Sequence, residues 1–200
     1  LGVRTRFHGT PNEVAEPIPF ARDTVHASYD AQAVNRFWRA LVQVDRVLKH
    51  FRTGFLGKVS PVHLFWGSFD LAVTRFSGRR APPHPGALNV ADRVTREAYS
   101  HEVSSCGFWP GGAGLEQPIF YSYAYAEPAG FKDAPVRSKG AFYARELGEF
   151  VLSYDEVRQA AAPDETLLDF LQSTYEAAAN AAHWDRAALE RTATPPPSSV

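Results

Sequence analysis

The chain has 200 residues, of which 44% are hydrophobic and 22% are charged. This length and balance suit one domain with a buried core and exclude wholesale disorder. The 21 basic and 22 acidic residues leave a net charge of −1, so composition gives no reason to expect nucleic acid or an anionic membrane as a partner. The sequence has no apolar run of about 18 residues, and we expect no membrane-spanning helix.

The first residue and the cysteine count add two expectations. The chain begins with Leu1 and contains no methionine, so we expect a processed or partial chain that lacks an upstream segment. Cys106 is the single cysteine, which excludes an internal disulfide and a zinc site built from cysteines. One cysteine agrees with a reducing compartment, and we predict a cytoplasmic location.

The two ends of the chain have weak structural signals. Residues 3–7 alternate apolar and polar side chains, which predicts a short edge strand. Residues 10–27 contain three prolines and are predicted to form an extended loop. At the other end, residues 192–200 contain three consecutive prolines and are predicted to be a disordered tail. These signals place a single domain at residues 1–191.

Two segments have the periodicity of amphipathic helices. Between residues 30 and 53, apolar residues recur at spacings of three and four, from Val34 to Phe51. Asp30 or Ser28 can accept hydrogen bonds from the first free backbone amides of this helix. The second segment, residues 164–183, has an apolar stripe of its own. Each stripe must pack against another element, and we expect both to pack on one sheet.

Four segments alternate in the manner of strands or are rich in aromatic and β-branched residues. They are residues 59–76, as one strand or as two short strands broken near Gly67, and residues 102–109, 118–127 and 149–153. A short helix is predicted at 92–99 and a helical turn at 155–161. The connections between the strands are too short or too rich in proline for regular crossover helices. We therefore predict an α+β fold, a mainly antiparallel sheet of about four or five strands with two amphipathic helices packed on one face.

Three motifs carry a resemblance to a known family. They are SPVHLFWGSFDLAVTRFSGRR from Ser60, HEVSSCGFWPG from His101, and FLQSTYE from Phe170. They resemble the signature of a bacterial family of uncharacterised proteins, a domain of unknown function whose members reach about 300 residues. The resemblance extends to about Leu189 and implies that this chain corresponds to the C-terminal two-thirds of a longer protein with a β-rich N-terminal segment. It implies no activity and no catalytic residues.

Asp70 lies between two apolar residues in the first aromatic segment, so we expect it to be largely buried. A buried carboxylate needs a partner or has a raised pKa. Arg75, Arg79 and Arg80 are candidate partners. A structural ion pair and an active site would both produce this arrangement, and the remaining alternative is an aspartate on a solvated face of the sheet.

Arg79 and Arg80 open a loop at residues 78–91 that is stiffened by prolines. Two adjacent guanidinium groups on such a loop can hold a carboxylate or a phosphate at little entropic cost. His84, in the same loop, can add a proton donor. The alternative for all three residues is a solvated surface loop.

His101 and Glu102 stand at the entry to a strand and are candidate catalytic residues together with Asp70. Adjacent residues of a strand point to opposite faces, so His101 and Glu102 are not expected to touch each other. No His-x-His or His-Glu-x-x-His spacing occurs. We therefore assign no metal ligands and keep a metal-dependent enzyme only as an alternative.

Tyr121, Tyr123 and Tyr125 share one face of their strand and present a broad apolar surface with hydroxyl groups at its rim. With Trp66 and Asp70, two of them, Tyr121 and Tyr123, are predicted to line a concave pocket on the sheet face that the two helices leave open. A pocket of this composition suits a small ligand.

These observations give three functional hypotheses. We predict that the protein binds or converts a small anionic molecule in this pocket, with Arg79 and Arg80 holding the anionic group. The first alternative is an interaction module whose tyrosine face packs against a second copy or against the missing N-terminal segment. The second is a metal-dependent enzyme. The sequence identifies no cofactor and does not decide whether the protein is an enzyme.

Overall fold

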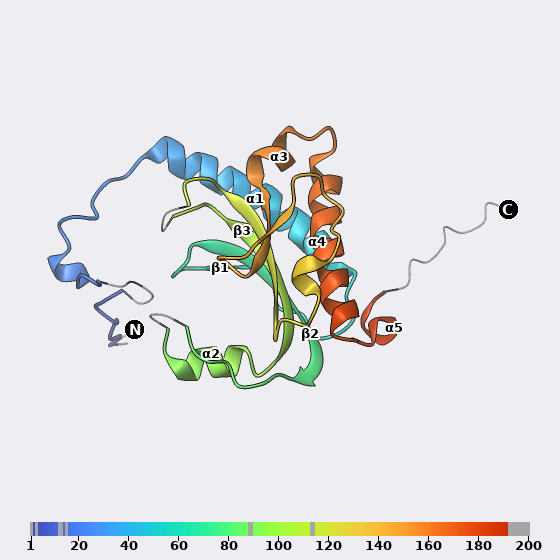
Figure 1. Cartoon of the computed structure of the whole chain (residues 1–200). Coiled ribbons are helices and arrows are strands. Elements are labelled where there is room, and N and C mark those ends of the chain that lie inside the picture. Colours follow the sequence, from blue (N-terminus) through green and yellow to red (C-terminus); the bar gives the residue numbers. More distant parts are fainter. Residues whose placement is uncertain are drawn as a thin grey trace.

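The computed structural model describes residues 2, 4–11, 14, 16–87, 90–112 and 115–191, and Figure 1 shows the arrangement of their helices and strands. The strands are β1 (His63–Phe65), β2 (Asp70–Arg80), β3 (His101–Trp109), β4 (Ile119–Tyr125), β5 (Phe142–Ala144) and β6 (Glu149–Ser153). The α-helices are α1 (Ala31–Thr53), α2 (Asp92–Ala98), α3 (Tyr154–Gln159), α4 (Pro163–Ala181) and α5 (Arg186–Leu189). Short 3-10 turns lie at Phe20–Arg22 and Phe131–Asp133.

The strands form one sheet in the order β1-β2-β3-β4-β6-β5, and every neighbouring pair is antiparallel. This topology confirms the predicted α+β fold. The segment at 59–76 is broken near Gly67, where a turn separates β1 from β2. The sequence does not predict β5, because three residues carry too short a pattern. With β5, and with β1 and β2 as separate strands, the sheet has six strands.

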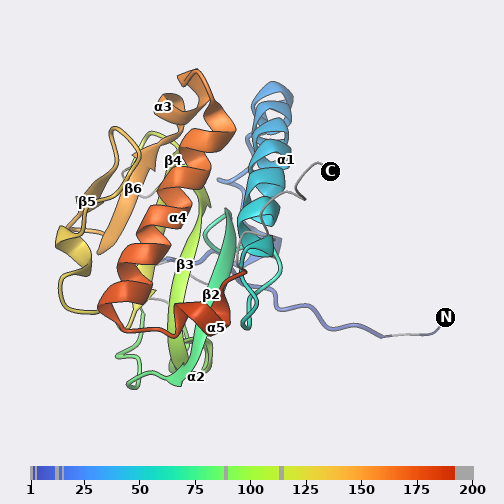
Figure 2. The ribbon, with the colours of Figure 1, turned by 90° about the vertical axis from the view of Figure 1, so that its right-hand side faces the viewer.

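α1 and α4 lie side by side over one face of the sheet, as Figure 2 shows. Their ends fall within two residues of the predicted helices at 30–53 and 164–183. The Asp30 side chain caps α1 by accepting hydrogen bonds from the backbone amides of Gln32 and Ala33, at 2.8 and 3.0 Å. The apolar stripes of both helices join alternate side chains of the strands, among them Val73 and Phe108, in one core.

The structure departs from the sequence expectations near the chain ends and in one loop. Residues 4–9 have no regular secondary structure, so the edge strand predicted at 3–7 is wrong over the residues described. Residue 3 and the predicted tail at 192–200 lie outside the described residues. β2 continues to Arg80, so the loop predicted to begin at residue 78 begins at residue 81.

Arg75 on β2 is buried beneath the two helices with only 1% of its surface exposed. Its guanidinium group lies 3.5 Å from the ring centre of Phe51 on α1 and 4.3 Å from that of Tyr175 on α4. The Phe55 ring is 5.2 Å away. The group donates hydrogen bonds to the Phe51 carbonyl and to Gln172 of α4. Burial lowers its pKa to about 10, which leaves it charged at neutral pH, where cation–π contacts stabilise it.

We predict that Arg75→Ala lowers the free energy of unfolding by about 3 kcal/mol, because it removes the cation–π contacts and leaves a cavity between the helices and the sheet. Urea denaturation measures the loss. Arg93→Ala, on the exposed side of α2, is the matched control and should change stability by less than about 0.5 kcal/mol. Equal stability of the two variants would contradict the role assigned to Arg75.

Candidate functional site

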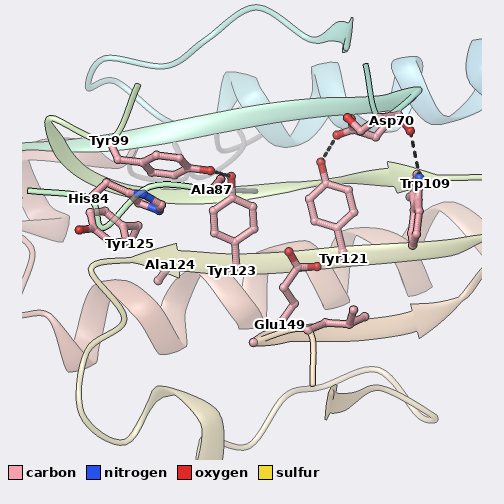
Figure 3. Close-up of a pocket in the computed structure, with 13 residues that line it drawn as sticks. Asp70, His84, Ala87, Tyr99, Trp109, Tyr121, Tyr123, Ala124, Tyr125 and Glu149 are labelled. Atoms are coloured by element: carbon pink, nitrogen blue, oxygen red, sulfur yellow. Dashed lines mark hydrogen bonds between the residues drawn. The ribbon is translucent and has the colours of Figure 1, made fainter. Parts of the chain in front are cut away.

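A cavity of about 650 Å³ lies on the sheet face turned away from α1 and α4 (Figure 3). Residues of β2, β3, β4 and β6 supply its floor, and segments on either side of α2 and the turn between β5 and β6 supply its walls. The lining residues are Ser68, Asp70, His84, Ala87, Tyr99, Trp109, Tyr121, Tyr123, Ala124, Tyr125, Leu147, Gly148 and Glu149. Four of the site residues predicted from the sequence are among them: Asp70, His84, Tyr121 and Tyr123.

The side chain of Tyr121 extends from β4 across β3 toward β2. In the sheet register, Tyr121 is opposite Gly107 of β3, and Gly107 is opposite Ala72 of β2. A Cβ atom at Gly107 would lie 2.7 Å from the Tyr121 hydroxyl oxygen and 2.5 Å from the Leu71 carbonyl oxygen. Because glycine leaves this space free, the phenol ring lies over β3 and its hydroxyl donates a hydrogen bond to Asp70.

Neutral donors hold the Asp70 carboxylate, which is 8% exposed. The Tyr121 hydroxyl donates to one carboxylate oxygen and the Ser68 hydroxyl donates to the other. The Ser68 carbonyl in turn accepts a hydrogen bond from the indole of Trp109 at 3.0 Å. Burial, reinforced by the charge of Asp70, raises the pKa of Tyr121 well above its usual range. The phenol therefore stays protonated and remains a donor.

The opposite end of the cavity is a cluster of rings around His84. Its imidazole stacks on Tyr99, with ring centres 4.5 Å apart, and lies 4.8 Å from the ring centre of Tyr125. The backbone amide of Gly86 donates a hydrogen bond to His84 Nδ1 at 3.0 Å. The other ring nitrogen, Nε2, takes no part in this hydrogen bond. The Tyr99 and Tyr123 hydroxyl groups share a hydrogen bond of 2.9 Å. The cavity thus has a carboxylate end and an aromatic end, as Figure 3 shows.

Glu149, at the start of β6, is the second acidic residue of the lining. In Figure 3 its carboxylate points toward the rings of Tyr121 and Tyr123. Burial, and then the nearby charge of Asp70, raises the pKa of Glu149 to about 7. At neutral pH this side chain therefore exchanges a proton readily and can act as a proton acceptor or donor toward a bound molecule.

The expected arginine partners do not contact Asp70. Arg75 is an odd number of residues away on the same strand, so it faces the helices and not the cavity. Asp70 and Arg80 are the two ends of the 11-residue strand β2, a separation of about 30 Å. Arg79, beside Arg80, pairs with Glu102 at 2.7 Å. The prediction that one of these arginines is the partner of Asp70 is wrong.

Five candidates from the sequence lie outside the cavity lining. Arg80 and His101 are cross-strand neighbours at the far end of β2 from Asp70, and the Arg79–Glu102 ion pair lies beside them. Trp66 is in the turn between β1 and β2 and is 80% exposed. The structure therefore does not place Arg79 and Arg80 at the cavity, and it does not bring His101 and Glu102 to Asp70.

Tyr99, Trp109 and Glu149 line the cavity, although the sequence does not predict them as site residues. Each lies at the end of a predicted element, next to the residues where helix or strand signals fade. Glu149 is the first residue of the strand predicted at 149–153, and only the pairing of β6 with β4 brings it beside the tyrosines. These contacts depend on the order of the strands in the sheet, and the local sequence pattern does not reveal that order.

The described residues support neither a cysteine nucleophile nor a metal site. Cys106 is buried in the core beneath the helices, and burial raises its thiol pKa to about 12, so it is not a nucleophile at neutral pH. No group of three or more His, Cys, Asp or Glu residues could hold a metal ion in the part of the chain that the structure describes. No helix among these residues is long and apolar enough to cross a membrane.

Comparison with known protein families bears on this site. A family model described as a family of unknown function, DUF5996, matches residues 1–191. The chain belongs to DUF5996. Searches of curated proteins and of solved structures find no match. Membership confirms the resemblance to a domain of unknown function. DUF5996 supplies no activity to transfer, so the function of this member must be argued from the cavity itself.

We predict that Gly107→Ala lowers the free energy of unfolding by about 2–3 kcal/mol, because the added methyl group displaces Tyr121 and presses on the β2 backbone. Gly54→Ala is the control. The backbone there is right-handed, and the new methyl group would meet its nearest neighbours at 3.5 and 3.8 Å. Urea denaturation should show a loss only for the first variant, and equal effects would exclude a special packing role for Gly107.

Glu149 makes stability depend on pH. Its pKa in the folded chain, about 7, is above the ordinary value of 4.5, so the folded state binds the proton more tightly and loses stability as pH rises through this range. We predict that Glu149→Gln is more stable than the natural chain by about 1–2 kcal/mol near pH 8, with a smaller difference near pH 5. Thermal unfolding at both pH values measures this, and Glu146→Gln, exposed in the same turn, should show no such trend.

Proposed function

We propose that the cavity on the open face of the sheet binds a small molecule that carries a basic amine or another cationic group. The observation that carries the proposal is the charge of the lining. Asp70 and Glu149 are its two acidic residues, and no arginine or lysine is among the described lining residues. A carboxylate pair in a partly desolvated cavity favours a positively charged ligand.

This proposal reverses the charge of the ligand expected from the sequence. An anion would enter a cavity that already holds Asp70 and Glu149, and no guanidinium group of the described lining would offset the repulsion. The arginines that suggested an anion, Arg79 and Arg80, lie outside the lining. A cation would instead offset the repulsion between the two carboxylates and would favour the deprotonated form of Glu149.

The aromatic side chains support the same class of ligand. Tyrosine and tryptophan faces attract cations, and this attraction is strongest where the cation has lost its water. Tyr121, Tyr123 and Trp109 surround the space between the two carboxylates. The His84, Tyr99 and Tyr125 cluster at the other end suits a planar or apolar group. An arylalkylamine, with a ring and an amine separated by a short chain, fits both ends.

The alternative of a docking surface made by the tyrosines has less support. Tyr121 is only 8% exposed and bonds to Asp70. Tyr123 is held by Tyr99, and the Tyr125 hydroxyl donates to the Pro82 carbonyl at 3.0 Å. Their hydroxyl groups are paired within the chain and their rings line a concavity, which suits a small ligand better than a protein surface.

The test is a binding panel of matched small molecules. Phenethylamine and its quaternary ammonium analogue should raise the melting temperature of the natural chain more than that of Asp70→Asn, whereas phenylethanol should not raise it and any effect of phenylpropionate should be the same in both chains. Asp70→Asn should weaken amine binding measured by calorimetry by about tenfold or more, the effect of losing one charge-assisted contact. Glu165→Gln, an exposed carboxylate on α4, removes the same charge far from the cavity and should leave the affinity unchanged.

Two results would contradict the proposal. One is binding of the carboxylate probe in this cavity, shown by an affinity that Asp70→Asn increases. The other is amine binding that Asp70→Asn and Glu149→Gln leave as strong as in the natural chain, because the cation would then lie elsewhere. If no amine of the panel bound at millimolar concentration, an amine site in this cavity would likewise be excluded.

A further inference from the structure

A second concave site lies on the helix side of the sheet, where it is separated from the first cavity by the sheet itself. It is a groove of about 830 Å³ between the N-terminal half of α1 and α3. Figure 2 shows α1 and α3 at the same end of the molecule. Phe37 and Trp38 of α1, Phe108 of β3 and Tyr154 of α3 are among its lining residues.

The N-terminal half of α1 carries apolar side chains that the helix does not bury. The residues that α1 buries, Val44, Val47, Leu48 and Phe51, all lie in its C-terminal half. In the N-terminal half, Trp38 is 59% exposed and Val42 is 46% exposed, and both line the groove. The helix therefore presents large apolar side chains to a concavity that the described residues leave uncovered.

The floor of the groove is aromatic. The Phe108 ring lies 5.3 Å from the ring of Tyr154 and 6.4 Å from that of Phe37, measured between centres. These rings come from three different elements that the core holds in place. They form a preorganised apolar surface of the kind that receives the body of an organic ligand.

The charges around this floor are opposite in sign to those of the first cavity. Arg36 and Arg39 of α1 and Arg158 of α3 line the groove. Asp155 is the one carboxylate among the described lining residues, and it is already paired with Arg158 at 2.5 Å. Arg36 and Arg39 have no ion pair within the described part of the chain. Two guanidinium groups beside an apolar floor suit a carboxylate, phosphate or sulfonate.

We propose that this groove binds a small amphipathic organic anion. Its apolar body lies on Phe37 and Tyr154, which the buried Phe108 ring supports from below, and its anionic group meets Arg36 and Arg39. The inference is independent of the amine site, because the two cavities lie on opposite faces of the sheet and share no described lining residue. The aromatic floor and the two arginines together define the ligand class. An inorganic anion would not contact the aromatic floor, and a neutral apolar compound would not pair with the arginines.

Anilinonaphthalene sulfonate, an aromatic anion that fluoresces in apolar surroundings, is a suitable probe. Titration of the full chain should show one saturable site. The Arg36→Ala/Arg39→Ala double variant should raise the dissociation constant by about tenfold or more, whereas Arg93→Ala/Arg145→Ala, which removes the same charge from positions outside the groove, should leave it unchanged. Decanoate should compete with the probe, and decylamine should not.

Additional measurements locate the bound probe and show whether its charge matters. Phenylnaphthylamine, the uncharged analogue of the probe, should bind more weakly than the sulfonate and with the same affinity to natural chain and double variant. Asp70→Asn should not affect probe binding, because the first cavity is on the other face. Equal affinity of the double variant and its control would overturn the proposal. A dimer by light scattering that Trp38→Ala dissociates would also overturn it, because the groove would then be an interface between copies.

Discussion

A single buried cation determines how the layers of this fold are held together. Arg75 leaves the sheet on the helix side and is surrounded by rings from α1, from the residues that follow it and from α4. Its hydrogen bonds go to the same two helices. Because a buried guanidinium without these contacts would be costly, both helices must stay on this face. The opposite face is consequently left without a helical layer over its centre, and a cavity forms there.

The alternation of each strand then separates two kinds of chemistry. On β2, Leu71, Val73 and Arg75 face the helices, while Asp70 and Thr74 lie on the opposite face, where Asp70 lines the cavity. One sheet therefore separates an acidic cavity from a groove with an excess of arginine. The two faces carry charges of opposite sign, and the charges nearly cancel over the whole chain. The net charge therefore says nothing about either site. The composition excludes a strong electrostatic field around the whole molecule, but it does not predict the electrostatic potential at each site.

Most of the fold is predictable from local pattern, and most of the site is not. The stripes of α1 and α4 and the alternation of β3 and β4 identify these elements because each is long enough to repeat. The burial of Asp70 follows from its apolar neighbours. Its partner does not, because the contact depends on Tyr121 crossing Gly107 from a strand two positions away in the sheet. Arg79 and Arg80 are close to Asp70 in sequence but lie at the other end of the same extended strand, and extended strands separate near neighbours more than helices do.

The burial of Cys106 has a practical consequence. The residue is 3% exposed and its thiol does not ionise near neutral pH. Alkylating reagents should therefore not react with this cysteine in the folded chain. A cysteine introduced at Leu147, which is 49% exposed at the edge of the acidic cavity, would be the sole reactive thiol. A fluorophore attached there would report occupancy of that cavity without prior removal of the native sulfur.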